Sequence, residues 1–396
     1  MKFVALDIFA GCGGFSSGLI QAGHEVTSAL EIDSWAAETY QFNHRNVNLL
    51  TEDITKVDST YFKVNFKDRV NLVVGGPPCQ GFSVSGPRQY GVYKKENALV
   101  AEYIRVIKAV EPEYFILENV RGFTTATIEG RIKALNFLLA ELREIGYHVY
   151  HDVLQAADYG VPQLRSRLFV VGSRHPIANP FPNKTHSLNG TQHLRPYLSI
   201  MEAIGDLPII NACEGTDNLV QYSLEPQNDF QQAMRNGSLG VYNHEAMKHS
   251  ARIVERFATI QPGGSGYKLG TVKGKDAPET VYKSNNQRLI SDQPALCITA
   301  NWQSSYIHPL LNRNLTVREA ARIQTFPDSY VFKGKRAVPS ASLLRKLGRD
   351  DENFLSQCHQ VGNAVPPLLA KQIFERLSVA VEGVDEESSE QLQLWG

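Results

Sequence analysis

Apolar and polar positions along the first 172 residues predict strands and helices in alternation. Short apolar runs rich in β-branched residues are typical of buried strands, and between them apolar residues recur at helical spacing. The predicted strands are Phe3–Phe9, Val26–Leu30, Asn48–Leu50, Val70–Val74, Tyr114–Leu117 and Leu168–Val171. The helix predicted at Ile132–Ile145 ends before Gly146, a residue type common just past a helix. This alternation favours an α/β fold built on a doubly wound, Rossmann-like sheet.

The pattern changes after Gly172, where prolines interrupt any regular spacing of apolar residues. Asn, Gln and Ser lie between these prolines, and the glycine-rich stretch 262–266 follows. The middle of the chain is therefore predicted to form a smaller, irregular domain. Order returns at Thr316, which together with Glu319 forms the capping box that begins a helix. That helix is predicted to stop before Phe326.

Composition narrows the class of protein. The 396 residues, 42% of them hydrophobic, suffice for two domains with sizeable cores. No apolar run has the length of a membrane span, and residues 1–4 do not begin a cleavable signal. Five cysteines without a Cys-x-x-Cys pair argue against a disulfide framework and against a zinc site. We therefore expect a cytoplasmic protein without a bound metal.

Charge is distributed unevenly, although the net formal charge is only −1. Residues 241–349 contain 17 Lys and Arg against 7 Asp and Glu, whereas residues 371–396 contain 2 against 6. A basic segment within a neutral chain is compatible with a face that binds phosphates, and equally with a solvated surface. Charge alone leaves these two interpretations open. The last dozen residues are expected to form a frayed acidic tail.

The most informative stretch runs from Gly75 to Ser83 and reads Gly-Gly-Pro-Pro-Cys-Gln-Gly-Phe-Ser. It directly follows a predicted buried strand, and ligands bind at the carboxyl ends of strands in open α/β sheets. Two prolines fix the backbone before Cys79, and the flanking glycines let another molecule approach closely. A buried structural cysteine is the ordinary alternative. The motifs that accompany Cys79 favour a presented nucleophile instead.

A second glycine-rich turn, from Phe9 to Gly14, lies between the first predicted strand and a helix. Its Phe-x-Gly-x-Gly-Gly pattern lacks the third glycine of a dinucleotide fingerprint and suits a nucleoside without a pyrophosphate. Glu31 ends the next strand, where an acid can accept hydrogen bonds from ribose hydroxyls. Asp53 ends the third strand and could meet an adenine amino group. Either acid alone could be a helix cap or a solvated loop residue, but the three strand ends together predict a nucleoside site.

A carboxylate and two arginines follow later strands. Glu118 comes after the predicted strand at 114–117 and should point into the same crevice as Cys79. A buried carboxyl there can donate a proton or a hydrogen bond to a ring nitrogen. Arg165 and Arg167 alternate with other residues, which predicts that both guanidinium groups lie on one face of a strand. They could hold a base carbonyl, a phosphate or the thiolate loop, or serve as structural ion-pair partners.

Together these motifs resemble those of DNA (cytosine-5) methyltransferases of the bacterial restriction-modification type. In family order, the resemblance rests on Phe9–Gly14, Gly76–Ser83, Glu118-Asn119-Val120, Gln163–Arg167, Arg318–Pro327 and Gln360–Pro367. It spans residues 3–370 and does not cover the variable region near 175–300. The combination in this order is highly specific.

The resemblance implies transfer of a methyl group from S-adenosylmethionine to carbon 5 of a cytosine in a specific double-stranded DNA sequence. Carbon 5 is a poor nucleophile, and addition of the Cys79 thiolate to C6 turns the ring into an enamine that takes up the methyl group. Glu118 is expected near N3 of the base and Arg165 near O2. Loss of the C5 proton and of Cys79 then restores the ring. The target base must flip out of the duplex to reach Cys79.

The resemblance also implies a set of site residues. The expected catalytic residues are Cys79, Glu118, Gln163, Arg165 and Arg167. The expected cofactor-binding residues are Phe9, Gly11, Gly13, Gly14, Glu31, Ile32, Asp53, Ile54, Pro77, Leu99, Asn363, Ala364 and Val365. Glu31 is assigned to the ribose, Asp53 to the adenine and residues 363–365 to the methionine portion.

The expected domains follow from the same comparison. A catalytic S-adenosylmethionine-dependent domain is expected at 1–173, and a target-recognition domain at 174–349 with a bracing helix at 316–325. A C-terminal segment at 350–396 is expected to return to the catalytic domain and to end in the acidic tail. The expected partners are double-stranded DNA and a restriction endonuclease that acts separately, with no membrane, and the chain is expected to be a monomer.

Two departures from the family pattern stand out. Residues 94–97 read Lys-Lys-Glu-Asn where many relatives have Asp-x-Arg, and residues 297–299 read Cys-Ile-Thr where Thr-Ile-Thr is common. Alternatives remain open. A tRNA cytosine methyltransferase would usually carry a Cys-Phe-Thr motif, which is missing from this sequence, and a nicotinamide-dependent oxidoreductase would need the third loop glycine and a partner cysteine. A catalytically dead nucleic-acid-binding module would be free to lose Cys79, Glu118 and Arg165.

Overall fold

The computed structural model describes residues 1–78, 98–128, 132–266, 286–339, 341–349 and 354–393. Contacts divide the chain into two compact units. Unit 1 comprises Met1–Tyr159, Ser166–Lys184 and Pro367–Gly396, and unit 2 comprises Gly160–Arg165 and Thr185–Pro366. This division into two units does not test the three domains expected from the sequence, which stay a prediction.

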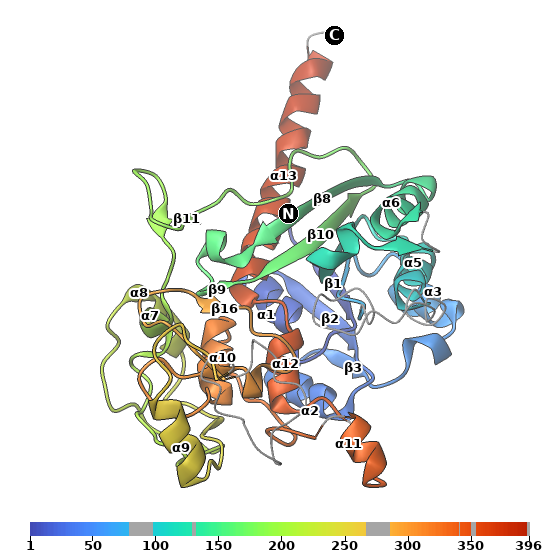
Figure 1. Cartoon of the computed structure of the whole chain (residues 1–396). Helices are drawn as coiled ribbons and strands as arrows, with labels where there is room; N and C mark the ends of the chain where they lie inside the picture. Colours follow the sequence, from blue (N-terminus) through green and yellow to red (C-terminus); the bar gives the residue numbers. More distant parts are fainter. Residues whose placement is uncertain (79–97, 129–131, 267–285, 340, 350–353, 394–396) are drawn as a thin grey trace. The chain divides into compact units, whose positions relative to one another are not determined.

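Unit 1 contains a seven-stranded sheet in the order β3-β2-β1-β4-β5-β10-β8 (Figure 1). Its strands are β1 (Val4–Ile8), β2 (Glu25–Leu30), β3 (Asn48–Leu50), β4 (Leu72–Gly75), β5 (Tyr114–Val120), β8 (His148–Gln155) and β10 (Ser166–Ser173). β1 to β5 run parallel, whereas β10 runs antiparallel to both β5 and β8. The predicted α/β sheet is confirmed. The edge strand β8 was missed because most of its side chains are exposed or half-buried, which leaves no apolar run.

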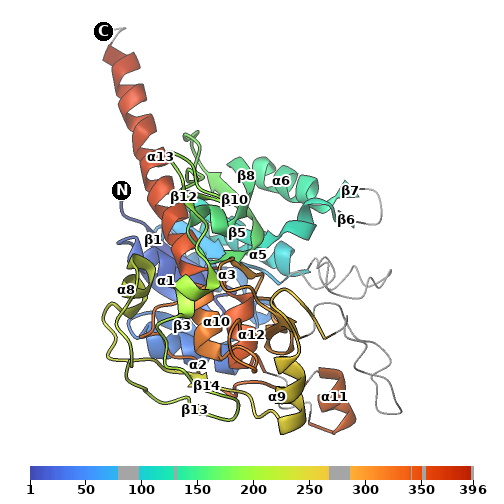
Figure 2. The same ribbon diagram turned by 60° about the vertical axis from the view of Figure 1, so that its left-hand side comes forward.

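Helices cover both faces of this sheet, as Figure 2 shows. On one face, apolar side chains of the strands form a core with α3 (Ser59–Phe66), α5 (Ala98–Val110) and α6 (Ala134–Glu144). On the other face, Phe15 of α1 (Gly14–Gln21) contacts Phe169 of β10 and Phe374 of α13 (Pro367–Gln393). Successive strand residues point to opposite faces. In β1, Leu6 and Ile8 therefore join the first core, and Asp7 points to the side of α1.

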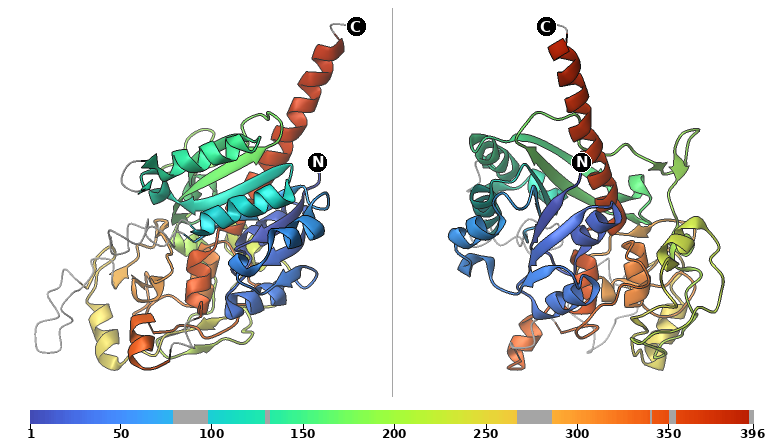
Figure 3. Two further views of the ribbon diagram at one scale, coloured as in Figure 1. Left: turned by 90° about the vertical axis from the view of Figure 1, so that its right-hand side faces the viewer. Right: turned by 180° about the vertical axis from the view of Figure 1, so that it is seen from behind.

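The helix α13 packs along α1 through a close approach at Gly18. A Cβ on Gly18 would lie 2.5 Å from the Cβ of Ala370, so only glycine allows this helix pair. The amino terminus of Met1 forms an ion pair with Glu382 on α13. The helix extends beyond the other elements of unit 1 (Figure 3) and continues to Gln393. The frayed acidic tail expected from the sequence stays a prediction.

Shorter elements complete unit 1. α2 follows β2 and begins at Ser34, with the Asp33 side chain accepting hydrogen bonds from two backbone N–H groups of its first turn. α2 spans Ser34–Asn43. The other short elements are η1 (Ile54–Lys56), η2 (Arg121–Thr124), β6 (Thr127–Ile128), β7 (Ile132–Lys133) and η3 (Ala156–Tyr159). The predicted helix before Gly146 begins later than expected, at Ala134, because β7 takes up its first two residues. Gly146 follows the helix with a φ of 90°, as its predicted position requires.

Unit 2 is irregular, as the sequence predicted, and consists of short elements joined by long loops. Its strands are β9 (Gln163–Leu164), β11 (His186–Ser187), β12 (Arg195–Pro196), β13 (Gly215–Thr216), β14 (His244–Glu245), β15 (Gln287–Arg288), β16 (Ala295–Leu296) and β17 (Tyr306–Ile307). Its helices are α7 (Ile200–Ile204), α8 (Asp229–Arg235), α9 (Ala251–Ala258), η4 (Trp302–Ser304), α10 (Val317–Ile323), α11 (Ala341–Lys346) and α12 (Gln357–Asn363).

The helix α10 is the central element of unit 2, because all seven of its residues are buried. The predicted capping box is confirmed. The Thr316 side chain accepts a hydrogen bond from the Glu319 N–H, and the Glu319 carboxylate accepts one from the Thr316 N–H. In the described part of the chain, no helix is both long and apolar enough to cross a membrane.

Candidate active site

The loop after β1 has the backbone of a turn that admits a ligand. Phe9, Gly11 and Gly13 all have positive φ, at 59°, 56° and 93°. Glycine enters this region freely, and other residues rarely do. Gly13 is the N-cap of α1, and a Cβ on Gly11 would meet no described atom within 4 Å. The structure thus gathers the predicted residues Phe9 to Gly14 into an open loop before a helix N-terminus.

Glu31 holds this loop in place from the end of β2. Its side chain is 6% exposed and accepts hydrogen bonds from the N–H of Gly11 at 2.7 Å and of Asp33 at 2.8 Å. Burial raises the pKa of the Glu31 carboxyl, and these backbone hydrogen bonds oppose the rise. The next residue, Ile32, is 62% exposed. An acceptor carboxylate and an exposed apolar side chain therefore stand next to each other beside the loop.

Asp53 lies at the end of the segment after β3 and caps η1. One of its carboxylate oxygens accepts hydrogen bonds from the backbone N–H and the hydroxyl of Thr55, at 2.9 Å and 2.8 Å. These hydrogen bonds lower the pKa of the Asp53 carboxyl. Ile54 beside it is buried. The helix-cap alternative weighed for Asp53 is thus realised, and an adenine contact would have to use the remaining acceptor sites of the carboxylate.

These residues fit the cofactor that the sequence implied. A nucleoside needs acceptors for its hydroxyl and amino groups and an apolar surface for its base, and Glu31, Asp53 and Ile32 offer these at consecutive strand ends. The open space beside Gly11 leaves room for the rest of the ligand. The Rossmann-type strand order changes direction between β1 and β4, which is where such sheets bind ligands.

The end of β4 lies against the end of β5. Gly75 pairs with Leu117, and a Cβ on Gly76 would lie 3.2 Å from the Oε2 of Glu118. The Asn119 side-chain amide donates a hydrogen bond to the Pro77 carbonyl at 3.3 Å. These contacts attach the start of the Gly-Gly-Pro-Pro-Cys stretch to the strand that carries Glu118. Cys79 itself lies outside the described residues.

Glu118 forms an ion pair with Arg167, because β5 and β10 are adjacent. Phe169 pairs with Glu118 and Arg167 with Val120, so Arg167 is the diagonal neighbour of Glu118 on the same face of the sheet. The Arg167 Nε lies 3.1 Å from the Glu118 Oε1, and both side chains are at most 15% exposed. The structure therefore brings together Gly76, Glu118 and Arg167.

Arg165 and Gln163 lie in unit 2, and their side chains bind protein groups. Arg165 is 1% exposed and donates hydrogen bonds to the carbonyl oxygens of Ile298, Gly362 and Ala364 at 2.7–3.1 Å. The Gln163 amide donates to the carbonyl of Ile323 at 3.1 Å and to the Gln324 side chain at 2.6 Å. Both side chains thus tie together segments of unit 2 that are distant in sequence.

The prediction that Arg165 and Arg167 share one face of a strand is wrong. β9 ends at Leu164 and β10 begins at Ser166. Arg165 lies between them, outside both strands, and its N–H donates to the Gln163 carbonyl at 3.1 Å. The regular alternation of side chains therefore stops at this point.

Of the remaining predicted cofactor residues, Leu99 is half-buried in α5 and packs against the core of unit 1, and Pro77 is buried. Asn363 ends α12 and is exposed, and Val365 is buried. The Ala364 carbonyl accepts hydrogen bonds from Arg165 and from Gln324. Residues 363–365 belong to unit 2, and their part in a cofactor site stays a prediction.

A buried polar network next to the cofactor loop was not predicted. The Asp7 carboxylate accepts a hydrogen bond from the Ser16 hydroxyl at 2.6 Å, and that hydroxyl lies 2.7 Å from the Tyr40 hydroxyl. Asp7 is fully buried, and burial raises its pKa to about 7. The signal in the sequence was a charged residue in the middle of an apolar strand, since such a residue must have a partner or be neutral.

The basic segment 241–349 is less basic at its surface than its composition suggests. Four of its arginines are at most 5% exposed, namely Arg288, Arg313, Arg318 and Arg322. Arg313 pairs with Glu319 through two hydrogen bonds of 2.7–2.8 Å, and Arg288 donates to backbone carbonyls of five residues. Part of the excess positive charge therefore lies inside unit 2, in buried ion pairs and hydrogen bonds.

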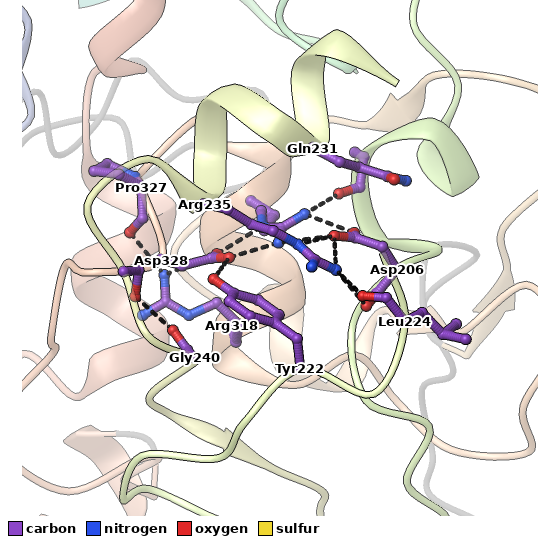
Figure 4. A network of polar contacts seen from close by, with 12 residues as sticks. Asp206, Tyr222, Leu224, Gln231, Arg235, Gly240, Arg318, Pro327 and Asp328 are labelled. Carbon is purple, nitrogen blue, oxygen red and sulfur yellow. Dashed lines mark hydrogen bonds and ion pairs between the residues drawn. The ribbon is translucent and has the colours of Figure 1, made fainter. Parts of the chain in front are cut away.

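One of these buried clusters centres on Arg322, and Figure 4 shows Asp206, Asp328, Arg235 and Tyr222 within it. Its guanidinium donates to Asp206 at 2.9 Å and to Asp328 at 2.5–2.6 Å, and all three side chains are fully buried. Arg235 donates to Asp206 at 2.7 Å, and the Tyr222 hydroxyl donates to Asp328 at 2.6 Å. The cluster links α7, α8 and α10 to the segment after α10.

Comparison with known proteins places these features in a family. The chain is 40% identical to the type II methyltransferase M.DdeI of Desulfomicrobium norvegicum, over 96% of this chain and 89% of that protein. It is 33% identical to the type II methyltransferase M1.HphI of Haemophilus parahaemolyticus, over 95% and 86%. Among solved structures, it matches a prophage-encoded DNA modification methyltransferase of E. coli with a TM-score of 0.71 and 22% identity, over 96% of this chain and 100% of that one, which supports the fold. A family model described as C-5 cytosine-specific DNA methylase matches residues 3–379. The chain therefore belongs to the family of C-5 cytosine-specific DNA methylases.

Proposed function

We propose that this chain methylates carbon 5 of one cytosine in a specific duplex sequence through covalent addition of Cys79 to C6 of the base. Family membership implies a DNA substrate and the use of S-adenosylmethionine. The observation that carries the proposal is the position of Glu118. Its carboxylate lies against Gly76, three residues before Cys79, and pairs with Arg167.

The proposed reaction begins with bond formation between the Cys79 sulfur and C6. Glu118 supplies a proton or hydrogen bond at N3, which takes up the electron density displaced from the C5–C6 double bond. The cofactor, when bound, supplies an electrophilic methyl group to C5. A base then removes the C5 proton, the C6–S bond breaks and the aromatic ring is restored. The target base must leave the helix stack, at a cost of roughly a few kcal/mol.

We assign the position beside the base to Arg167 in preference to Arg165. Arg167 already holds the carboxylate of Glu118 and is partly exposed, so it can orient Glu118 and offer a further N–H to the O2 of the base. Three carbonyl oxygens already accept hydrogen bonds from the buried Arg165. For Arg165 and Gln163 we propose a positioning role inside unit 2.

We propose that the cofactor lies along the loop from Phe9 to Gly14. Glu31 would accept hydrogen bonds from the ribose hydroxyls while holding the loop through Gly11, and Asp53 would meet the adenine amino group. Ile32 would lie against the adenine ring. For residues 363–365 we propose the contact with the methionine portion that the family resemblance implies.

The relatives suggest the biological setting. Because several of them are type II methyltransferases, we propose that this chain acts as a monomer within a restriction-modification system. A separate endonuclease would then cut the same sequence when it is unmethylated. Residues of unit 2 would read that sequence in the DNA grooves.

Bisulfite sequencing tests the proposal directly. The chain is expressed in a host without cytosine-5 methylation, and its genomic DNA is compared with DNA from a host that expresses the Glu118→Gln variant. We expect protected cytosines at one position of a short recurring sequence, and none with the variant. Unprotected genomic DNA, or protection found only in tRNA from the same cells, would contradict the proposal.

A further inference from the structure

Asp7 is a buried carboxyl that the proposed reaction does not use. It is fully buried in β1, two residues before the cofactor loop begins at Phe9. One of its oxygens accepts a hydrogen bond from Ser16. The other, Oδ1, is buried and has no hydrogen-bond partner among the residues that the structure describes. A buried ionised carboxylate is costly unless a positive charge compensates it.

The neighbours of Asp7 do not supply that charge. The groups that interact with it are Ser16 of α1, Tyr40 of α2, Cys12 of the loop and Glu31 after β2, and, from the other face of the sheet, Tyr103 of α5. Burial keeps the two tyrosines and the cysteine neutral by raising their pKa values. His44, which stacks beside Tyr40, is kept neutral because burial lowers its pKa to about 4. None of these described groups is a cation.

Burial and the acidic neighbour Glu31 raise the pKa of Asp7 to about 7. At neutral pH the carboxyl is therefore protonated in a large share of free molecules. Charges interact strongly in a poorly solvated interior, even across a loop. A cation bound at the cofactor loop would therefore favour the ionised form of Asp7.

We propose that Asp7 is the buried counter-charge of the sulfonium cofactor and gives up its proton to solvent when that cation binds. This inference rests on the proposed cofactor site. S-adenosylmethionine carries a sulfonium charge, and its demethylated product S-adenosylhomocysteine carries a neutral thioether instead. Transfer of the methyl group removes the positive charge, so Asp7 takes a proton back as the product forms. The loop thus distinguishes substrate from product by charge as well as by shape.

The test is a count of protons released on binding, because it does not depend on turnover. Calorimetric titrations in buffers of different ionisation enthalpy give that number for each ligand, from about pH 5.5 to about pH 8.5. The two ligands share their amino, carboxylate, ribose and adenine groups, so the difference between them isolates the sulfonium. Near pH 7 we expect S-adenosylmethionine to release about half a proton more than its product. Below that pH, its relative affinity should fall by up to about tenfold per pH unit.

Variants assign the proton to one carboxyl. Asp7→Asn should remove the difference between the two ligands, whereas Glu31→Gln should weaken both ligands and keep the difference, with its pH midpoint lowered because Asp7 loses an acidic neighbour. Asp58→Asn, which removes an exposed helix-capping carboxylate of unit 1, is the matched control and should change nothing. If Asp7→Asn does not fold, Ser16→Ala serves instead. It should move the pH midpoint of the difference upward, because the lost hydrogen bond favours the ionised carboxylate.

Each outcome decides the question. Equal proton release for both ligands, or a difference that disappears with Glu31→Gln and survives Asp7→Asn, would overturn the role of Asp7 while leaving the proposed function intact. Failure of the unaltered protein to bind either ligand would refute the cofactor site, and the role of Asp7 with it.

Discussion

The guanidinium of Arg167 and the carboxylate of Glu118 lie 3.1 Å apart across the neighbouring strands β10 and β5. Such a partly buried pair fixes the orientation of both side chains more firmly than an exposed one, because solvent screens it less. The adjacent Gly76 has no side chain, which lets the Glu118 carboxylate approach the backbone that leads to Cys79. The acid of the proposed reaction is thus positioned by its neighbours before any base arrives.

Substitution of the two arginines should separate their roles. Arg167→Met should lower methylation by about 10²-fold or more, because Glu118 loses its orienting partner, while thermal stability changes little. Arg165→Met should instead destabilise the protein by about 2–5 kcal/mol, because three buried carbonyl oxygens lose their donor. Methylation rates and thermal unfolding of both variants are the measurements. The reverse pattern would return the catalytic role to Arg165.

Glu31→Ala should weaken S-adenosylmethionine binding by about 1–3 kcal/mol, and duplex binding without cofactor should hardly change. The loss has two sources, since Glu31 holds the Gly11 N–H as well as offering acceptors to the ligand. Glu25→Ala, a change at an exposed carboxylate at the other end of β2, is the matched control. Calorimetry measures both variants, and an unchanged affinity for Glu31→Ala would show that the strand-end assignment is wrong.

Arg322→Met should be among the most destabilising changes in unit 2. It leaves Asp206 and Asp328 buried without their shared partner, and breaking a buried ion pair in this way costs about 3–5 kcal/mol. Arg336→Met provides the control, because its partner Glu245 is 30% exposed and such pairs contribute about 0–1 kcal/mol. Urea unfolding compares the two variants, and equal losses of stability would speak against the central role of Arg322.

Asp7→Asn should stabilise the cofactor-free protein at alkaline pH. The pKa of Asp7 is about 7 in the folded chain and about 4 in an unfolded one, so the folded state binds the proton more tightly. Stability from this group is therefore present at acidic pH and is lost as pH rises from about 4 through 7. The variant escapes that loss and should gain about 1–3 kcal/mol near pH 8.5. Thermal unfolding across pH measures the gain, and a gain independent of pH would contradict the buried ionisation.

Local sequence patterns predicted the parallel part of the sheet well. Apolar runs that end in Gly75 or just before Glu31 mark strands buried on both faces, and glycines after them mark ligand loops. The capping box at Thr316 specified a helix start through two side chains within one turn. These strands, loops and helix starts are determined by interactions within a few residues, so the local sequence is enough to predict them.

Other features depend on contacts between distant residues and left no local signal. Arg165 and Arg167 look equivalent in sequence, but Arg165 lies outside β9 and β10 and binds carbonyl oxygens of unit 2, whereas Arg167 lies in β10 and pairs with Glu118. The charge of residues 241–349 suggested a surface, whereas Arg322 turns inward to Asp206, 116 positions away. Asp7 was visible as a polar residue in an apolar strand, but its partner Ser16 comes from α1, and Tyr40, which contacts Ser16, comes from α2.

The most direct test of the central claim is a covalent trap with 5-fluorocytosine at the target position of a duplex, in the presence of S-adenosylmethionine. Cys79 should add to C6 and the methyl group should move to C5. The reaction should then stop, because fluorine cannot leave as the proton does, and the protein should stay bound to DNA. Peptide mapping should place the bond on Cys79 and not on Cys12, Cys213, Cys297 or Cys358. Cys79→Ser should abolish the adduct, since a hydroxyl is far less nucleophilic than a thiolate. An adduct that survives this substitution, or methylation that proceeds without Cys79, would contradict the account.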